Sequence, residues 1–287
     1  MTDQIILSLE DQTGVMAENG PMRMIIQAWN RGKPDLEMAS EAARFSFACL
    51  EQVAKHHEHL TQQPRDLPLG LGPIPRTMVE SVMATGEKDL TPMAAVAGSI
   101  ADAVADWLFT RGMSRVIVNN GGDIAIRLAE NETARVGIRT RIDNSSISQM
   151  VELTGIDYPS WGINTSGLGG RSLTRGIASA VTAFARNSSL ADAAATSIAN
   201  ACFVRDDAIV QAPAQMVDPH TDIPGVLVTI KVGKLKKGNV LQAMKKALIR
   251  AEQYSEAGII KGALIAVENE FLVTHEFNSK VAQLHSV

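Results

Sequence analysis

The run Leu190-Ala191-Asp192-Ala193-Ala194-Ala195-Thr196-Ser197-Ile198-Ala199-Asn200-Ala201 is the stretch around which the chain is organised. Nearly every residue in it is small, and in helical register Asp192 and Thr196 lie four residues apart on one face. A carboxylate and a hydroxyl stacked in this way can both reach one hard cation, and magnesium prefers oxygen ligands of this kind. The same run also suits an alanine-rich core helix with an acidic residue near its N-terminus, where the helix dipole favours negative charge.

Length and composition are those of an ordinary globular protein. The chain has 287 residues, of which 45% are hydrophobic and 20% are charged. This length allows one large domain or two small ones. No linker stands out, so we expect a single domain over residues 1–287. A net charge of −4 and a pI of about 5.9 argue against a general binder of nucleic acid or acidic membranes.

The two cysteines, Cys49 and Cys202, are isolated in apolar stretches. They supply no disulfide framework, zinc pattern or iron–sulfur ligand set. The N-terminus lacks a basic segment followed by a long apolar one, and no apolar run reaches about 18 residues. We therefore expect a cytoplasmic protein without a signal peptide or a membrane span.

Helical and strand patterns alternate along the chain without a regular β-α-β rhythm. Helical spacing predicts helices over residues 34–55, 76–84, 91–110, 190–201 and 234–252. The last of these is basic, and we expect its charged side chains to face solvent. Alternating or β-branched runs predict strands over residues 5–9, 22–29, 115–118, 124–128, 134–140, 179–185, 226–232, 262–267 and 271–275. This order favours the α+β class, with small-residue helices on a mixed, mostly antiparallel sheet.

Two small-residue helices have similar sequences. Residues 95–103 align with residues 193–201, and about two-thirds of the positions are identical. Alanine richness inflates such matches, so chance is one explanation. The other is an internal duplication in which each half places a small-residue helix against the sheet.

A polar turn follows the strand over residues 115–118. It reads Asn119-Asn120-Gly121-Gly122-Asp123, and its glycines supply the positive φ that a tight turn needs. Such a turn can be only a hairpin. It can also present backbone N–H groups to an anion or to the edge of a nucleotide.

A second glycine-rich stretch runs from Trp161 to Ser172 and contains Thr165-Ser166-Gly167-Leu168-Gly169-Gly170-Arg171. Glycines let backbone amides approach a phosphate, and Arg171 could hold an oxyanion through two hydrogen bonds. The stretch lacks the lysine of a P-loop and has no signal for a helix directly after it. A flexible glycine loop is the alternative interpretation.

Three stretches in this order resemble the ApbE superfamily, the FAD:protein FMN transferases. They are the small-residue helix beginning at Pro92 with the Asn-Gly-Gly-Asp turn behind it, the Asn164–Gly167 segment, and the Ala191–Thr196 run. The resemblance covers roughly residues 92–205. The whole chain looks most like a short, cytoplasmic branch of that superfamily, so the resemblance implies an ApbE-like fold.

The resemblance also implies site residues. In ApbE proteins an aspartate and a threonine bind a magnesium ion that meets the FAD pyrophosphate, and the matching residues here are Asp192 and Thr196. A backbone carbonyl near Ala97-Gly98 would complete the metal site. The family's Gly-Gly-Asp turn lies beside the nucleotide and matches residues 121–123, and its Thr-Ser-Gly segment matches residues 165–167.

The chain departs from the transferases at two places. They carry His-Ile-x-Asp-Pro-x-Thr-Gly between Thr-Ser-Gly and Ala-Asp-Ala, whereas residues 171–179 here read Arg-Ser-Leu-Thr-Arg-Gly-Ile-Ala-Ser. Their Gly-Lys-Gly is replaced by Val96-Ala97-Gly98. The resemblance therefore implies that the metal and phosphate half of the site is kept, while the catalytic half is lost or replaced.

Four functions remain open from the sequence. The first is a magnesium-dependent site for FAD, FMN or another nucleotide, in which Asn119, Asn120 and Asp123 contact the nucleoside and the residues from Gly167 to Arg171 hold phosphate. The second is FMN transfer onto a protein threonine or serine. The third is a flavin-holding subunit or assembly factor of a redox enzyme. The fourth is a structural module whose small-residue helices pack or form a homo-oligomer.

Overall fold

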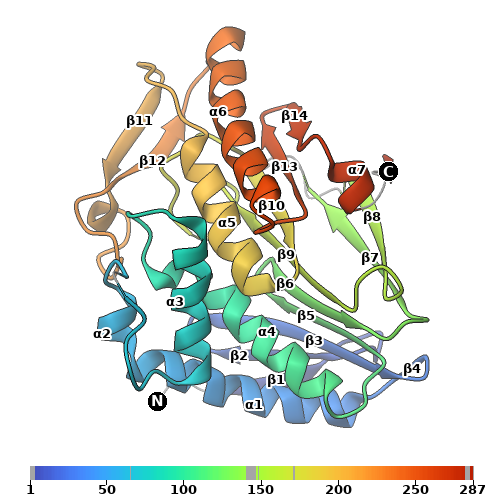
Figure 1. Cartoon of the computed structure of the whole chain (residues 1–287). Helices are drawn as coiled ribbons and strands as arrows, with labels where there is room; N and C mark the ends of the chain where they lie inside the picture. Colours follow the sequence, from blue (N-terminus) through green and yellow to red (C-terminus); the bar gives the residue numbers. More distant parts are fainter. Residues whose placement is uncertain are drawn as a thin grey trace.

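A long antiparallel sheet forms the centre of the computed structural model, which describes residues 4–64, 66–139, 147, 149–170, 172–281 and 285–286 (Figure 1). Its strands follow one another in space almost as they do in the chain. Their order is β1 (Ile5–Ser8), β2 (Val15–Asn19), β3 (Met22–Asn30), β5 (Arg115–Asn120), β6 (Asp123–Leu128), β9 (Ser160–Ser166), β10 (Ala180–Ala185), β13 (Gly262–Val267) and β14 (Glu270–Val273), with β4 (Lys33–Pro34) beside β3.

Helices cover one face of this sheet (Figure 1). In strand β3, Met24, Ile26 and Ala28 alternate toward this face and are fully buried, as expected for a strand with one side on the core. The covering helices are α1 (Leu36–Lys55), α4 (Val96–Phe109), α5 (Ser188–Ala201) and α6 (Lys237–Glu256), with α2 (His57–Leu60), α3 (Pro73–Thr85) and the short 3₁₀ helix η1 (Pro92–Ala95) beside them.

The other face of the sheet carries a smaller apolar cluster. Strands β7 (Thr133–Ile138), β8 (Gln149–Thr154) and β15 (His285–Ser286) form a small antiparallel sheet, and helix α7 (Phe277–Lys280) lies near it. Phe277 packs edge-on against Phe184 of β10, with ring centroids 5.3 Å apart. Burial of such aromatic side chains supplies much of the stabilisation of this layer.

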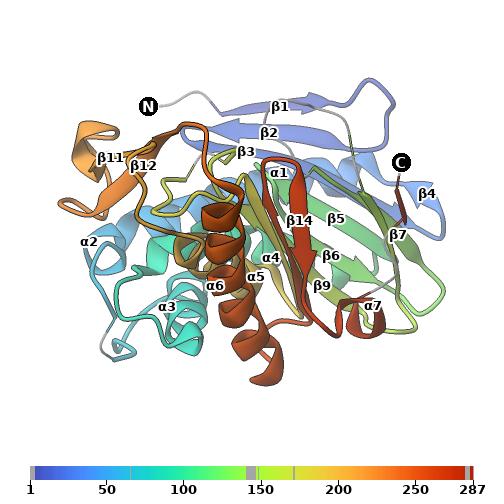
Figure 2. The same cartoon turned by 90° about the horizontal axis from the view of Figure 1, so that it is seen from above.

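A two-stranded arm extends beside the ends of α5 and α6 (Figures 1 and 2). It consists of β11 (Ile209–Pro213), the 3₁₀ helix η2 (Ala214–Met216) and β12 (Leu227–Val232). The backbone N–H of Thr229 donates to the Thr174 carbonyl at 2.8 Å, and Gln211 Nε2 donates to the Arg175 carbonyl at 3.1 Å. These contacts attach the arm to the segment that follows β9.

Eight of the ten strands of the main sheet form two similar four-stranded units. Each is a hairpin, two helices and a second hairpin: β2-β3, α1, α4 and β5-β6 in one, and β9-β10, α5, α6 and β13-β14 in the other. The inner strands pair as β3 with β5 and as β10 with β13, and the β6–β9 pair joins the units. In this arrangement α5 corresponds to α1 rather than to α4, so the sequence similarity between α4 and α5 does not follow the architectural repeat.

The predicted α+β class is confirmed, and the strand pairs formed by the described residues are antiparallel. Three local predictions need correction. Strands β2 and β11 were not predicted, the helix over residues 91–110 begins as η1, and residues 161–166 are strand rather than glycine loop. Within the described part of the chain, no helix is long and apolar enough to cross a membrane.

Candidate functional site

Helices α4 and α5 approach each other closely at Gly98. A Cβ atom on Gly98 would lie 2.4 Å from the Ser188 carbonyl oxygen and 2.9 Å from the Cβ of Asp192. The missing side chain therefore lets the Gly98 N–H donate to Asp192 Oδ2 at 2.9 Å. The small residues that the sequence places in both helices thus bring the backbone of one to the carboxylate of the other.

Asp102 of α4 fixes the first turn of α5. Its two carboxylate oxygens accept the backbone N–H groups of Ser188 and Ser189 at 2.9 and 2.8 Å, which satisfies two N–H groups that have no partner within the helix. Arg127 of β6 donates to the same carboxylate at 3.0 Å and to Asp106 at 2.6 Å. Burial opposes the charge of Arg127, but the two carboxylates outweigh this effect and raise its pKa.

The surroundings of Asp192 disfavour a negative charge on its carboxyl group in the absence of a cation. Burial raises its pKa well above the ordinary value, the nearby charges of Asp123 and Asp102 raise it further, and only the Gly98 N–H acts against them. Asp102 is balanced by Arg127, whereas no described cation contacts Asp192. A hard cation between Asp192 and Asp123 would relieve this repulsion, so the charge distribution fits a metal ion.

Thr196 lies one helical turn beyond Asp192 and is partly exposed. No hydrogen bond joins its hydroxyl to another described residue, so the oxygen is available as a ligand. The described residues hold no group of three or more His, Cys, Asp or Glu side chains suited to a metal ion. A magnesium ion here would therefore rely on a few protein oxygens together with phosphate and water, which is how proteins often bind it.

The Asn-Gly-Gly-Asp turn is the β5–β6 hairpin, and its polar side chains connect neighbouring elements. Asn119 Oδ1 accepts from the Gly122 N–H at 2.8 Å, within the turn itself. Asn120 Nδ2 donates to the Ala97 carbonyl at 3.2 Å, and Asp123 Oδ1 accepts from Asn164 Nδ2 at 3.0 Å. The turn thus lies beside the α4–α5 contact, with Gly121 and Gly122 both at positive φ.

The Thr-Ser-Gly segment is divided between the two faces of the sheet. Asn164 points toward α5, where its Oδ1 accepts from Ser188 Oγ at 2.8 Å, and Ser166 is buried with no hydrogen-bond partner among the described residues. Thr165 lies on the opposite face, is exposed, and shares a 2.9 Å hydrogen bond with Thr182. Of the predicted residues in this strand, Ser166 is the one on the side of the candidate site.

In the turn after β9, the backbone N–H groups are hydrogen-bonded to backbone carbonyls. Gly167 adopts a φ of +139°. The next three N–H groups donate to carbonyls of Ala178, Ser179 and Gly167 at 2.9, 3.1 and 3.0 Å respectively. These amides are therefore not free to bind the phosphate that the sequence suggested. Arg171, the predicted phosphate ligand, lies outside the described residues.

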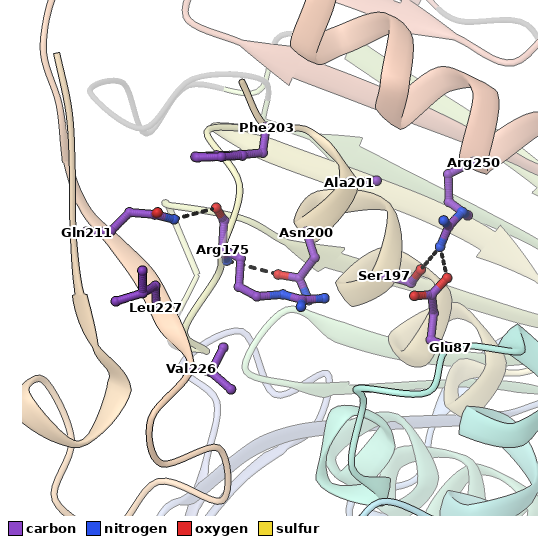
Figure 3. A pocket seen from close by; sticks show the side chains of 10 residues that line it. All are labelled: Glu87, Arg175, Ser197, Asn200, Ala201, Phe203, Gln211, Val226, Leu227 and Arg250. Carbon is purple, nitrogen blue, oxygen red and sulfur yellow. Dashed lines mark hydrogen bonds and ion pairs between the residues drawn. The ribbon is translucent and has the colours of Figure 1, made fainter. Parts of the chain in front are cut away.

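A cavity of about 420 Å³ opens at the C-terminal half of α5 (Figure 3). Asn200 continues the face of Asp192 and Thr196 by one more turn, and its Oδ1 accepts from the Arg175 N–H at 2.9 Å. Two arginines, Arg175 and Arg250, line this cavity. No role was predicted for Arg175, and Arg250 was expected to face solvent with the other charged residues of its helix, because their partners Asp89 and Glu87 lie far away along the chain.

The cavity arginines already have acidic partners. Arg175 Nη1 pairs with Asp89 and Arg250 Nη1 pairs with Glu87, two residues of the segment between α3 and η1. Arg250 also donates to Ser197 Oγ at 3.3 Å. A second cavity, of about 680 Å³, adjoins the first at Val226 and includes Asp89 in its lining.

Solved structures with a similar fold include two flavin transferases. The flavin transferase ApbE from Vibrio cholerae matches 98% of this chain and 100% of its own with a TM-score of 0.56 at 14% identity. The apo flavinyl transferase ApbE of Pseudomonas stutzeri matches 96% of this chain and 97% of its own with a TM-score of 0.55, also at 14% identity. The fold is therefore ApbE-like, as the sequence motifs predicted.

Relatives from archaea are more similar in sequence. A UPF0280 protein of Methanosarcina barkeri is 32% identical over 200 residues, which are 67% of this chain and 74% of the relative. Another, from Methanospirillum hungatei, is 32% identical over 239 residues, which are 80% and 91% of the two chains. The family described as AbpE bacteria matches residues 7–273, and the chain belongs to this family.

Proposed function

We propose that the protein binds a flavin nucleotide diphosphate through a magnesium ion held by Asp192 and Thr196. The observation that carries this proposal is the placement of Asp192, whose carboxylate accepts the Gly98 N–H of α4 at 2.9 Å and contacts no described cation, with Thr196 one turn further along α5. The ApbE-like fold supports a flavin as the nucleotide. The bound ion would supply charge neutralisation and a template for the diphosphate.

Each neighbouring residue has a role in this proposal. Asp123 adds negative charge beside Asp192. Asn164 orients the Asp123 carboxylate by donating a hydrogen bond to it. Asn120 donates to the Ala97 carbonyl, within the Ala97-Gly98 segment near which the resemblance implies a further backbone ligand. On the same side of the sheet, Ser166 offers a buried hydroxyl that has no hydrogen-bond partner among the described residues.

Calorimetric titration of the purified protein with FAD, with and without magnesium, tests this proposal. We expect binding only with magnesium, and the variant Asp192→Asn to weaken it at least tenfold, the usual loss for a contact with a charged group. Asp207→Asn, on an exposed aspartate beyond α5, is the matched control and should bind as the wild type does. Equal binding by Asp192→Asn would overturn the assignment.

Transfer of FMN to a protein is a second candidate, because the fold neighbours are flavin transferases. A covalent product needs a group that activates the acceptor hydroxyl, and residues 172–179 contain no histidine or carboxylate to do so. Incubation with FAD, magnesium and a lysate, followed by in-gel fluorescence, separates the two activities. Covalent flavin on a lysate protein would establish transfer, whereas FAD retention together with a stable redox partner would favour a flavin-holding role.

A further inference from the structure

The 420 Å³ cavity brings two arginine side chains together. Its described residues include two arginines, Arg175 and Arg250, against one carboxylate, Glu87, and the rest are neutral. Its volume lies within the usual range for small-molecule sites. Figure 3 shows Arg175 beside Asn200 and Arg250 beside Ser197, so both guanidinium groups approach α5.

The place of this cavity suits a second contact with the proposed ligand. Thr196 and Asn200 are four residues apart, so the cavity begins about 6 Å along the helix from the proposed metal ligands. Guanidinium groups bind phosphate oxygens through paired, charge-assisted hydrogen bonds.

Both guanidiniums are occupied by carboxylates of one short loop. Glu87 pairs with Arg250, and Asp89, two residues further on, pairs with Arg175. The second oxygen of Asp89 is buried without a partner among the described residues. A phosphate that reached either arginine would compete with these carboxylates for the same N–H groups.

We propose that the Arg175–Arg250 cavity is a phosphate subsite guarded by Glu87 and Asp89, which a ligand displaces when it binds. Displacement frees the loop over residues 86–90, which leads directly into η1. Because α4 follows η1 and carries Gly98, the exchange connects the subsite to the backbone beside Asp192. The subsite itself does not need the metal ion, although its biological ligand rests on the function proposed above.

Titration with inorganic pyrophosphate in metal-depleted buffer tests this proposal. Glu87→Gln keeps the shape of the side chain and removes the competing charge, so we expect roughly fivefold tighter binding, the upper end for a partly exposed ion pair. Arg250→Met removes a charged donor and should weaken binding on the order of tenfold or more. Lys245→Gln removes an exposed positive charge from the same helix and is the matched control.

The outcomes separate this proposal from the previous one. Unchanged pyrophosphate binding by Arg250→Met, or weaker binding by Glu87→Gln than by the wild type, would overturn the phosphate subsite. The absence of pyrophosphate binding by both the wild type and Glu87→Gln would also overturn it. Arg250→Lys retains the charge but not the planar fork and should lie between the wild type and Arg250→Met. Because the pyrophosphate titration contains no metal ion, it can succeed when magnesium-dependent FAD binding fails, so the two proposals are tested separately.

Discussion

Replacement of Gly98 by alanine should separate α4 from α5. The added Cβ would meet the Ser188 carbonyl oxygen at 2.4 Å, where ordinary contacts begin at 3.4 Å. The obstacle is backbone that no rotamer change can move, so the helices must shift by about 1 Å. Overpacking of this kind costs roughly 1–3 kcal/mol, and we expect the upper value. In a chain of this size, that corresponds to a melting temperature lower by roughly 6–12 °C.

Gly98→Ala should also move the Gly98 N–H away from Asp192, and with it the candidate metal ligand. Melting temperatures measured without magnesium give the loss of stability. The same measurement at magnesium concentrations that rise in 10-fold steps gives the response to the metal ion. Gly238→Ala, in the first turn of α6 with no atom near the added Cβ, is the control and should be neutral or stabilising by about 0.5–1 kcal/mol. A Gly98→Ala variant that melts with the wild type and keeps its response to magnesium would refute the reasoning.

Three further results are expected. Because the folded pKa of Asp192 is raised above its ordinary 3.8, metal-free protein should lose stability as the pH rises through and above about 4. Asp192→Asn should remove that loss, and melting curves across pH will show whether it does. Arg127→Met leaves Asp102 buried without its partner and should cost about 3–5 kcal/mol in denaturant unfolding; a cost below 1 kcal/mol would contradict the ion-pair role. Burial raises the pKa of both Cys49 and Cys202 to about 12, so a thiol reagent at pH 8 should label them only on unfolding, and rapid labelling of the folded protein would be inconsistent with their burial.

Local sequence signals were sufficient to identify much of the fold. Helical spacing located α1, α5 and α6, and the glycine pair predicted the β5–β6 hairpin. Strand β9 was misread because Gly162 looks like a loop residue, although its missing side chain allows the start of α5 to lie against the strand. A Cβ there would come within 2.0 Å of the Asn187 backbone, a contact invisible in the sequence.

The sequence predicted only those residues of the candidate site that belong to short, continuous motifs. Asp192, Thr196 and the polar turn at Asp123 are each recognisable locally, and the structure brings Asp123 close enough to raise the pKa of Asp192. Asp102 and Arg250 were not predicted as site residues. Their roles depend on contacts with residues 86 and 163 positions away, Ser188 and Glu87, and no local pattern encodes such pairs.

The division of the sheet into two units has a consequence for how the candidate site arises. Asp123 and Gly98 belong to the first unit, whereas Asp192 belongs to the second, and within the sheet the units are joined by one strand pair, β6 with β9. The second unit carries the candidate ligands Asp192 and Thr196, and the first unit supplies the Gly98 N–H and the Asp123 carboxylate beside them. Cation affinity would therefore depend on the association of the two units. If the chain were cut between β8 and β9, we expect the separate fragments to bind the cation only after they are mixed and associate.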